Sequence, residues 1–407
     1  MKTYIDPVIK ARIQRAWNQL RPEQRARLQP LVEGSRVAMK AIQAQGVPPA
    51  SDFPREALLL HAALTDDRDN ALASLEIGIV VGVNGTGEII GTGKYEQLDP
   101  GWAECLAEWL EHFITGIHKF NTNPAVVPIP ENATIALAGD WGTGNWRNPS
   151  NPAPSENVAQ QIARLRPDVT IHLGDVYYSG TGPEEQHFLR DLWPAGALYS
   201  FALNSNHEMY AGAKPYFNAI SSPPFDKQNG CSYFALENTN WVIVALDSAY
   251  YSDREGLYQH GAIFSSKGRQ YQLEFLKQQV AKGKKVIVLT HHQGLAPDSS
   301  STTGLWDQVR SAFPQGGGPA YWYWGHVHVG AVYQPQANVS CRCCGHGGLP
   351  WGQAPDLNHA GVVWFEHRCA NDPDITERVF NGFAALTLSG ANFKETFYDE
   401  NGGIAWQ

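Results

Sequence analysis

The chain has 407 residues, of which 31 are Lys or Arg and 40 are Asp or Glu, giving a formal net charge of −9 at pH 7. This length predicts two to three domains, or one large domain with an appendage. The acidic balance argues against a nucleic-acid coat protein or a binder of anionic membranes, because both need a basic surface. If such a protein acts on a phosphate ester, it must create positive charge locally, and bound metal ions are the obvious source.

Neither a secretion signal nor a membrane-spanning segment is evident in the sequence. Charged side chains such as Asp6 and Lys10 interrupt the first 17 residues, so they lack the apolar stretch of a signal peptide. The apolar runs at 241–246 and 285–289 have strand length, far short of the roughly 18 residues of a membrane helix. The six cysteines form no evenly spaced disulfide framework, which favours a reducing compartment. We therefore expect a cytoplasmic protein.

The first third of the chain is predicted to be mostly helical. Apolar residues recur there at the spacing of a helix face, and prolines stand near the predicted helix starts. The predicted helices cover residues 9–20, 22–29, 53–64 and 102–113. The turn Asn84-Gly85 between two apolar stretches predicts a β-hairpin. Three prolines within 124–130 predict a linker, so we expect an N-terminal module of residues 1–128 and a second domain of residues 131–407.

From about residue 131, short apolar strands alternate with helices. Such alternation is typical of an α/β sheet core with crossover helices. Helices are predicted over 155–166 and 268–282. The predicted strands, each with the residues that follow it, cover 134–140, 168–175, 198–206, 241–247, 284–292, 320–328 and 361–368.

Polar residues that could bind metals follow five of these strands. In open α/β sheets, ligands bind beyond the carboxyl ends of the strands, so this location points to a shared site. A glycine at most of these ends lets the backbone turn sharply, and Gly-His-x-His can present two imidazoles to adjacent ions. Together the clusters predict a two-metal site. They are Gly139-Asp140-Trp141-Gly142, Gly174-Asp175-Val176-Tyr177-Tyr178, Ser205-Asn206-His207-Glu208, Val288-Leu289-Thr290-His291-His292 and Gly325-His326-Val327-His328.

These clusters resemble the motifs of the calcineurin-like metallophosphoesterases, and specifically those of the purple acid phosphatases: GDxG, GDxxY, GNH(E/D), VxxH and GHxH. One residue departs from the pattern, Ser205 in place of Gly, and we expect that change to alter only the turn. The resemblance covers residues from about 131 to 330 and is expected to continue to the C-terminus, so that residues 131–407 would form the metallophosphoesterase catalytic domain. The N-terminal third resembles no family that we can name. The resemblance implies the α/β (α+β) class, with a two-sheet β-sandwich flanked by helices, to which the helix-rich N-terminal module is added.

The resemblance also implies a role for each matching residue. The first metal would be held by Asp140, Asp175, Tyr178 and His328. Asp175 would bridge to the second metal, which Asn206, His291 and His326 complete. His207 would protonate the leaving alkoxide or orient the phosphate, so the catalytic residues would be His207 and Asp175.

The implied cofactors are two metal ions. A tyrosine phenolate is normally protonated until a pH of about 10, and a trivalent ion most readily holds it deprotonated at neutral pH. The resemblance therefore implies Fe(III) at the Tyr178 site, with Fe(II), Zn or Mn at the second.

Substrate recognition must differ from that of the plant and animal members, whose further histidines beyond the VxxH block contact the substrate. Here no histidine lies between His292 and His326. His292 is a candidate phosphate contact or a core residue. His346 is a second candidate, in the segment Cys341–Gly348, which is either a phosphate-binding loop or a structural turn with buried thiols.

We therefore predict an enzyme, a hydrolase of phosphoric esters that acts on a small phosphorylated substrate through a metal-bridging hydroxide. The purple-acid-phosphatase-like monoesterase is the first interpretation. A phosphodiesterase or nucleotide hydrolase of the same superfamily is the alternative, since both reactions use the same ligands. A third is a non-catalytic protein with a structural metal site, whose N-terminal module binds a partner.

Overall fold

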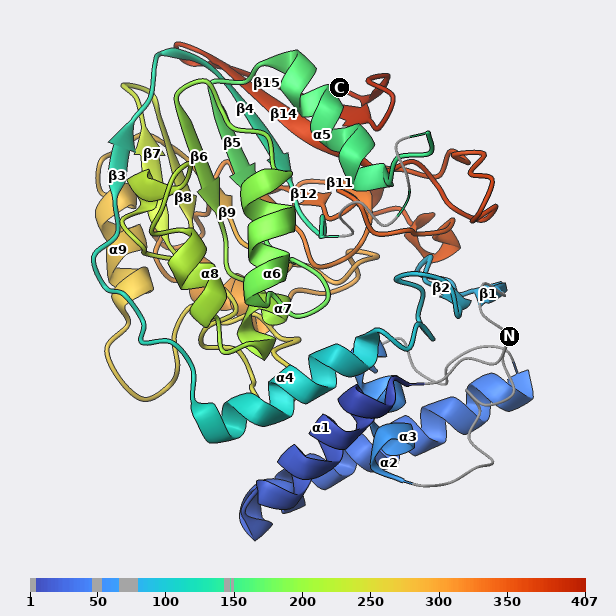
Figure 1. Cartoon of the computed structure of the whole chain (residues 1–407). Helices are drawn as coiled ribbons and strands as arrows, with labels where there is room; N and C mark the ends of the chain where they lie inside the picture. The colour runs from blue at the N-terminus through green and yellow to red at the C-terminus, as the bar shows by residue number, and fades with distance from the viewer. Residues whose placement is uncertain (1–4, 46–52, 66–79, 143–146, 148–149) are drawn as a thin grey trace.

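The computed structural model describes the whole chain apart from residues 1–4, 46–52, 66–79, 143–146 and 148–149. Two layers are evident: a helical layer formed by the N-terminal part of the chain, and an α/β body above it (Figure 1). No helix in the described part of the chain is both long and apolar enough to cross a membrane.

The helical layer is built from amphipathic helices. Asp6 caps the first helix by accepting a hydrogen bond from the backbone N–H of Val8 at 2.7 Å. Helix α4 buries Trp102, Leu106 and Trp109 completely. The elements are α1 (Pro7–Gln19), α2 (Pro22–Gln45), η1 (Arg55–Leu59), α3 (Leu60–Leu64) and α4 (Trp102–Thr115).

The predicted β-hairpin is present where the structure describes it. Strand β1 (Val80–Val83) pairs antiparallel with β2 (Ile89–Gly91). The first residues of the predicted hairpin, 75–79, lie outside the described residues.

Helix α4 joins the helical layer to the α/β body, so the two share one hydrophobic core (Figure 1). The indole Nε1 of Trp109 donates a hydrogen bond to the carbonyl of Arg254 at 2.9 Å. His112 Nε2 lies 2.8 Å from the hydroxyl of Tyr258. The N-terminal residues therefore pack directly on the body's loops.

The α/β body contains two large sheets among the described residues. The larger has the strand order β13-β11-β12-β10-β9-β8-β7-β3, and the smaller has the order β16-β15-β14-β4-β5-β6. The strands of the larger sheet are β3 (Val126–Pro128), β7 (Phe234–Glu237), β8 (Trp241–Ala245), β9 (Lys285–Leu289), β10 (Tyr321–Trp324), β11 (Gly330–Tyr333), β12 (Ser340–Cys344) and β13 (Val362–Phe365). Those of the smaller sheet are β4 (Asn132–Ala138), β5 (Val169–His172), β6 (Tyr199–Ala202), β14 (Gly382–Ser389), β15 (Asn392–Asp399) and β16 (Ile404–Trp406).

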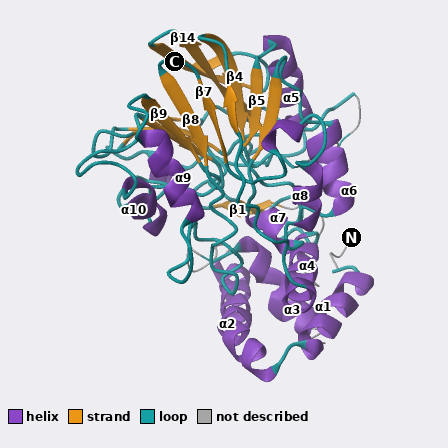
Figure 2. Ribbon diagram, turned by 90° about the vertical axis from the view of Figure 1, so that its left-hand side faces the viewer, coloured by secondary structure: helices purple, strands orange, loops and turns teal. Residues whose placement is uncertain are grey.

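The two sheets pack face to face around a buried apolar layer. Ile135 and Ile171 of the smaller sheet and Ile243 of the larger sheet belong to this layer and are fully buried. Helices cover the outer faces, with α5 beside the smaller sheet and α9 beside the larger (Figure 2). The predicted fold class, a two-sheet sandwich flanked by helices, is confirmed.

The remaining helices follow the strands of the body. The predicted helices 155–166 and 268–282 correspond to α5 and α9. The helical elements are α5 (Pro154–Leu165), α6 (Gly182–Glu184), the π-helical turn η3 (Glu185–Asp191), α7 (Asn206–Tyr210), α8 (Lys214–Ala219), η4 (Asp226–Gln228), α9 (Tyr271–Val280), α10 (Gly304–Arg310) and η5 (Pro355–Leu357).

The predicted linker is wrong at three residues. Val126–Pro128 form β3, which pairs parallel with β7 at the edge of the larger sheet. Proline lacks a backbone N–H, and an edge strand tolerates it because one side of that strand needs no ladder partner. The proline-rich stretch is therefore part of the body.

Candidate metal centre

The five polar clusters meet where strands of both sheets end. Asp140 and Asp175 follow β4 and β5 of the smaller sheet, and Asn206 begins α7 just after β6. His291 follows β9, and His326 follows β10, in the larger sheet. The site therefore lies beyond the carboxyl ends of strands from both sheets.

The backbone at three of these positions is strained. Asp140, Asp175 and His326 adopt positive φ angles of 56°, 73° and 65°. Such a conformation costs a non-glycine residue on the order of 1–3 kcal/mol and is held in place only by the surrounding structure. Each residue stands just beyond a strand end, and the turn directs its side chain into the shared site.

A first group of side chains surrounds one carboxylate oxygen of Asp175. The Asp140 Oδ1 and His328 Nε2 atoms are 3.2 Å apart, and His328 Nε2 lies 4.0 Å from Asp175 Oδ2. The Tyr177 hydroxyl lies 2.8 Å from Asp175 Oδ2 and 2.9 Å from His328 Nε2. It is also 3.5 Å from Asp140 Oδ1, so it sits among the three predicted ligands.

The structure does not bring Tyr178, the predicted phenolate ligand, into this group. Its hydroxyl instead donates a hydrogen bond to the buried Asp99, and its ring stacks on that of Tyr95 with centroids 4.9 Å apart. Both partners belong to the N-terminal part of the chain. The hydroxyl of the neighbouring Tyr177 lies beside Asp140, Asp175 and His328, where the resemblance implied that of Tyr178.

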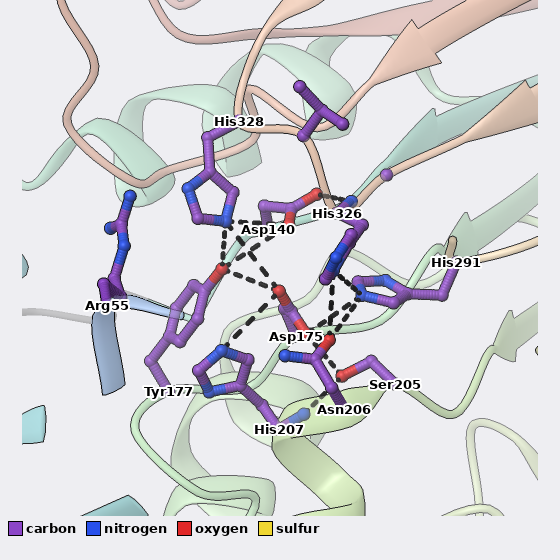
Figure 3. Close-up of polar contacts among 12 residues, drawn as sticks. Arg55, Asp140, Asp175, Tyr177, Ser205, Asn206, His207, His291, His326 and His328 are labelled. Atoms are coloured by element: carbon purple, nitrogen blue, oxygen red, sulfur yellow. Dashed lines mark hydrogen bonds and ion pairs between the residues drawn. The ribbon is translucent and has the colours of Figure 1, made fainter. Parts of the chain in front are cut away.

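A second group surrounds the other carboxylate oxygen of Asp175. His291 Nε2 lies 3.3 Å from Asp175 Oδ1 and 2.9 Å from Asn206 Oδ1. His326 Nδ1 lies 3.2 Å from both Asn206 Oδ1 and His291 Nε2. The four residues predicted around the second metal therefore converge, and Asp175 offers one oxygen to each group (Figure 3).

These separations fit metal coordination. Ligand atoms about 2.1 Å from a common ion and at right angles around it lie about 3 Å from one another. The donors are carboxylate, amide and phenol oxygens with imidazole nitrogens, which suit iron, zinc and manganese. The group Asp140, Asp175 and His328 is also close enough together to hold an ion on its own.

The electrostatics of the two groups also fit cations. Burial, and then the adjacent carboxylate of Asp175, raise the pKa of Asp140 well above its ordinary value. Burial lowers the pKa of His291, and lowers that of His328 to about 4, with a contribution from the nearby Arg55 charge. Two adjacent buried carboxylates facing neutral imidazoles are costly unless positive charge compensates them.

His207 lies beside the first group and is fixed at both ring nitrogens. Its Nδ1 lies 2.5 Å from the carbonyl oxygen of Tyr178 and donates a hydrogen bond to it. Its Nε2 lies 3.2 Å from Glu56 Oε1 and 4.0 Å from Asp175 Oδ2. Burial opposes protonation, but the charges of Asp175 and Glu56 prevail and raise the pKa of His207 to about 9.

Ser205 does more than alter the turn. Its hydroxyl accepts a hydrogen bond from the backbone N–H of His207 at 3.0 Å and so caps α7. The same hydroxyl makes short contacts with the carboxylates of Asp175 and Glu208. The expectation of a purely conformational substitution is therefore wrong, because Ser205 touches the carboxylate that joins the two groups.

His292 is held in the core. Its Nε2 donates a hydrogen bond to the carbonyl of Tyr258 at 2.8 Å, and its Nδ1 lies 2.9 Å from the hydroxyl of Ser248. The ring packs against His326, and one of its nitrogens lies within 4.8 Å of a nitrogen of His291 and of His326, a trio close enough together to hold an ion. Because both nitrogens are engaged elsewhere, the core interpretation of His292 fits better than a phosphate contact.

The segment around His346 is structural. Cys341, Cys343 and Cys344 lie buried in β12, and Arg342 pairs with Glu395 of β15 at 2.5 Å. His346 is 3% exposed and packs near Phe397, away from the cavity at the metal centre. Of the two interpretations of this segment, the structural turn with buried thiols therefore fits the described contacts better than a phosphate-binding loop.

A cavity of about 450 Å³ opens onto both groups. Several of its lining residues are not predictable from the sequence pattern, among them Arg55, Glu56, Gln259 and His260. Arg55 and Glu56 come from η1, in the part of the chain for which no resemblance was found. Their polar side chains at a helix start carried no signal that they would be buried.

Residues 133–330 match the family model described as calcineurin-like phosphoesterase. A search of curated proteins finds no match.

Several solved structures are similar to this chain at low sequence identity. One is GAP50, described as the anchor in the inner membrane complex of Plasmodium, at 12% identity, over 68% of this chain and 87% of that chain, with a TM-score of 0.46. Another is a dimetal phosphatase from Danio rerio, at 14% identity, over 66% of this chain and 95% of that chain, with a TM-score of 0.41. A third is 5'-nucleotidase from Candida albicans, at 11% identity, over 70% of this chain and 53% of that chain, with a TM-score of 0.35.

Proposed function

We propose that this protein is a dinuclear-metal phosphomonoesterase of the purple-acid-phosphatase type, acting on a small phosphorylated substrate. The observation that carries the proposal is the position of Asp175, whose Oδ2 faces Tyr177 and His328 while its Oδ1 faces His291. A carboxylate shared in this way is the feature that a two-metal hydrolase requires. When bound, the two ions supply an activated water for attack on phosphorus and neutralise the charge that develops on the phosphoryl oxygens.

The residues around Asp175 would divide the ligands between the two ions. Asp140, Tyr177 and His328 would hold the first ion with Asp175 Oδ2, and the phenol favours Fe(III) there. Asn206, His291 and His326 would hold Fe(II), Zn or Mn with Asp175 Oδ1. Tyr177 takes this role because its hydroxyl lies among the carboxylates, whereas that of Tyr178 is bonded to Asp99.

His207 would act as the general acid. Its Nε2 borders the cavity 4.0 Å from Asp175 Oδ2, beside the position where a phosphate would meet the ions. The buried Glu56 carboxylate, 3.2 Å from Nε2, favours the protonated imidazole, so that the ring can give a proton to the leaving oxygen. The hydrogen bond from Nδ1 to the Tyr178 carbonyl fixes the direction of the ring.

A phosphodiesterase or nucleotide hydrolase is the second candidate, and the cavity favours it. Its volume of about 450 Å³ exceeds what a phosphate group needs, and Trp351, Leu357 and Pro297 give it an apolar wall. A sizeable leaving group or second ester group would therefore fit.

A paired rate assay separates the two candidates. Purified protein, loaded separately with iron–zinc and with manganese, is assayed on para-nitrophenyl phosphate and on its bis ester from pH 4 to pH 9. The Asp140→Asn variant, purified identically, measures any contaminating phosphatase. A preference for the monoester at acid pH supports the phosphomonoesterase, and a preference for the diester nearer neutrality supports the second candidate. Background rates on both esters with every metal contradict the proposal.

A further inference from the structure

The cavity wall is not made by the family-matched segment alone. Phe53, Pro54, Arg55 and Glu56 line it from the N-terminal part of the chain, and Thr86 and Glu88 from the β-hairpin join them. Helix α4 packs these elements onto the body through one hydrophobic core. The N-terminal part is therefore placed to act on the substrate rather than only on a partner.

Arg55 is held rigidly at this wall. Its side chain is 6% exposed, and its Nη2 donates a hydrogen bond to Glu88 Oε1 at 2.9 Å. Its guanidinium carbon lies 5.4 Å from the centre of the Trp102 ring and 5.1 Å from that of the Trp351 ring. The two indoles restrict the guanidinium on both sides, so little side-chain conformational entropy is lost when a ligand binds it.

The guanidinium retains hydrogen-bonding capacity. A guanidinium has five N–H groups. Among the described residues, Arg55 donates one hydrogen bond to Glu88 Oε1 and one, at 3.5 Å, to the carbonyl of Tyr95. The side chain stands on the side of the metal centre where His328 and Tyr177 lie (Figure 3). The remaining N–H groups are therefore available to an anion that enters the cavity.

The charge of the lining makes Arg55 distinctive. Among the described residues that line the cavity, it is the one Lys or Arg, whereas the carboxylates of the lining are Glu56, Glu88, Asp175, Asp298 and Asp356. A phosphate that approaches the ions past these carboxylates meets repulsion unless a cation faces it. Arginine matches phosphate oxygens with two parallel N–H groups.

We propose that Arg55 binds the phosphate of the substrate and favours a monoester over a diester. A monoester dianion has three non-bridging oxygens that share two negative charges, whereas a diester monoanion has two such oxygens that share one charge. The monoester can therefore offer one more oxygen to the ions and to Arg55 together. The inference rests on the proposed function, because it deepens the substrate preference of the same site.

Inorganic phosphate is the direct probe, because its binding requires no turnover. Calorimetric titration of the metal-loaded protein should show that Arg55→Gln weakens phosphate binding at least tenfold, and that Arg55→Lys weakens it less. Arg27→Gln, a matched surface variant whose side chain is 64% exposed, should bind phosphate as the wild type does. Metal analysis should find two ions per chain in each variant.

A second variant, which should bind phosphate more tightly than the wild type, excludes misfolding as the cause of the changes in affinity. Glu88→Gln removes the negative charge that now pairs with Arg55 and keeps the side-chain shape, so it should tighten phosphate binding. In kinetics, Arg55→Gln should lower kcat/KM for para-nitrophenyl phosphate by about 10- to 100-fold and that for the bis ester less than about threefold.

The outcomes distinguish this inference from the proposed function. If the wild type hydrolyses neither ester yet Arg55→Gln weakens phosphate binding and Glu88→Gln strengthens it, the proposed function fails and the anion-binding role stands. Equal phosphate binding by wild type and Arg55→Gln, or no phosphate binding by the metal-loaded wild type, overturns the inference. So does an equal loss on the monoester and the diester.

Discussion

Glu56 Oε1 lies 3.2 Å from Nε2 of His207, so a carboxylate from the N-terminal part of the chain meets the imidazole proposed as the general acid. Both side chains are buried, and the opposite ring nitrogen is bound by the Tyr178 carbonyl. A buried anion beside an imidazole favours its protonated form. Glu56 therefore positions His207 and holds its proton.

We predict that Glu56→Gln lowers kcat about tenfold with little change in metal content. Glutamine retains a hydrogen-bond acceptor but removes the charge, so the pKa of His207 should fall. Since the protonated ring is the active form, the alkaline limb of the kcat profile should move to lower pH. A pH profile measured beside Glu33→Gln, a surface variant on α2, checks this. An unchanged alkaline limb would remove Glu56 from the catalytic arrangement.

The two adjacent tyrosines can be separated by spectroscopy. If Tyr177 binds Fe(III), the iron-loaded protein should show a visible phenolate-to-iron charge-transfer band that Tyr177→Phe abolishes. Tyr178→Phe should keep the band, because the Tyr178 hydroxyl is bonded to Asp99. Absorption spectra at matched iron content provide the measurement. A band that survives in Tyr177→Phe and vanishes in Tyr178→Phe would restore Tyr178 as the ligand that the family resemblance implied.

The metal stoichiometry should distinguish the two carboxylates. Asp175 faces both groups, whereas Asp140 Oδ1 faces only the first. We expect Asp175→Asn to lower kcat by at least about 10³-fold and to lose one or both ions, because an amide is a poorer bridging ligand than a carboxylate. Asp140→Asn should keep the ion held by Asn206, His291 and His326. Metal analysis of dialysed protein tests both, and two retained ions with full activity in Asp175→Asn would exclude the bridging role.

The strand-end residues were predictable because their positions depend on local pattern. Strands β4, β5 and β9 are largely buried, and each is a run of mostly apolar residues in the sequence. The residue at which each strand ends can therefore be predicted. Parallel strands then bring Asp140, Asp175 and His291 to one edge. The paired strands β14 and β15 were not predicted, because they follow the last polar cluster and alternate less clearly.

What the sequence did not reveal depends on contacts between distant segments. The choice between Tyr177 and Tyr178 is decided by Asp99, which accepts the Tyr178 hydrogen bond from 79 positions away. Arg55 and Glu56 have the pattern of exposed polar residues at a helix start. Contacts with distant residues bury them, Trp102 and Trp351 beside Arg55 and His207 beside Glu56. The N-terminal part therefore determines features of the site that its own pattern does not display.

His346 offers a test of the distinction between structural and substrate-binding histidines. Burial lowers the pKa of His346 to about 3, so the folded protein keeps the ring neutral. In the unfolded chain a histidine titrates at a pKa of about 6.5. As the pH falls below 6.5, the unfolded chain binds a proton at this residue and the folded chain does not. The free energy of unfolding therefore decreases as the pH falls, down to about pH 3.

Replacing this residue should therefore flatten the dependence of stability on pH. Between pH 7.5 and 5.5, one such histidine costs about 1.4 kcal/mol of unfolding free energy. In urea unfolding, the free energy of unfolding of His346→Gln should fall between pH 7.5 and pH 5.5 by about that amount less than the free energy of the wild type. His187→Gln, at an exposed histidine, is the control. Because His346 lies away from the cavity, kcat/KM at pH 7.5 should stay within about twofold of the wild type. A large loss of kcat/KM with an unchanged stability slope would return His346 to the substrate site.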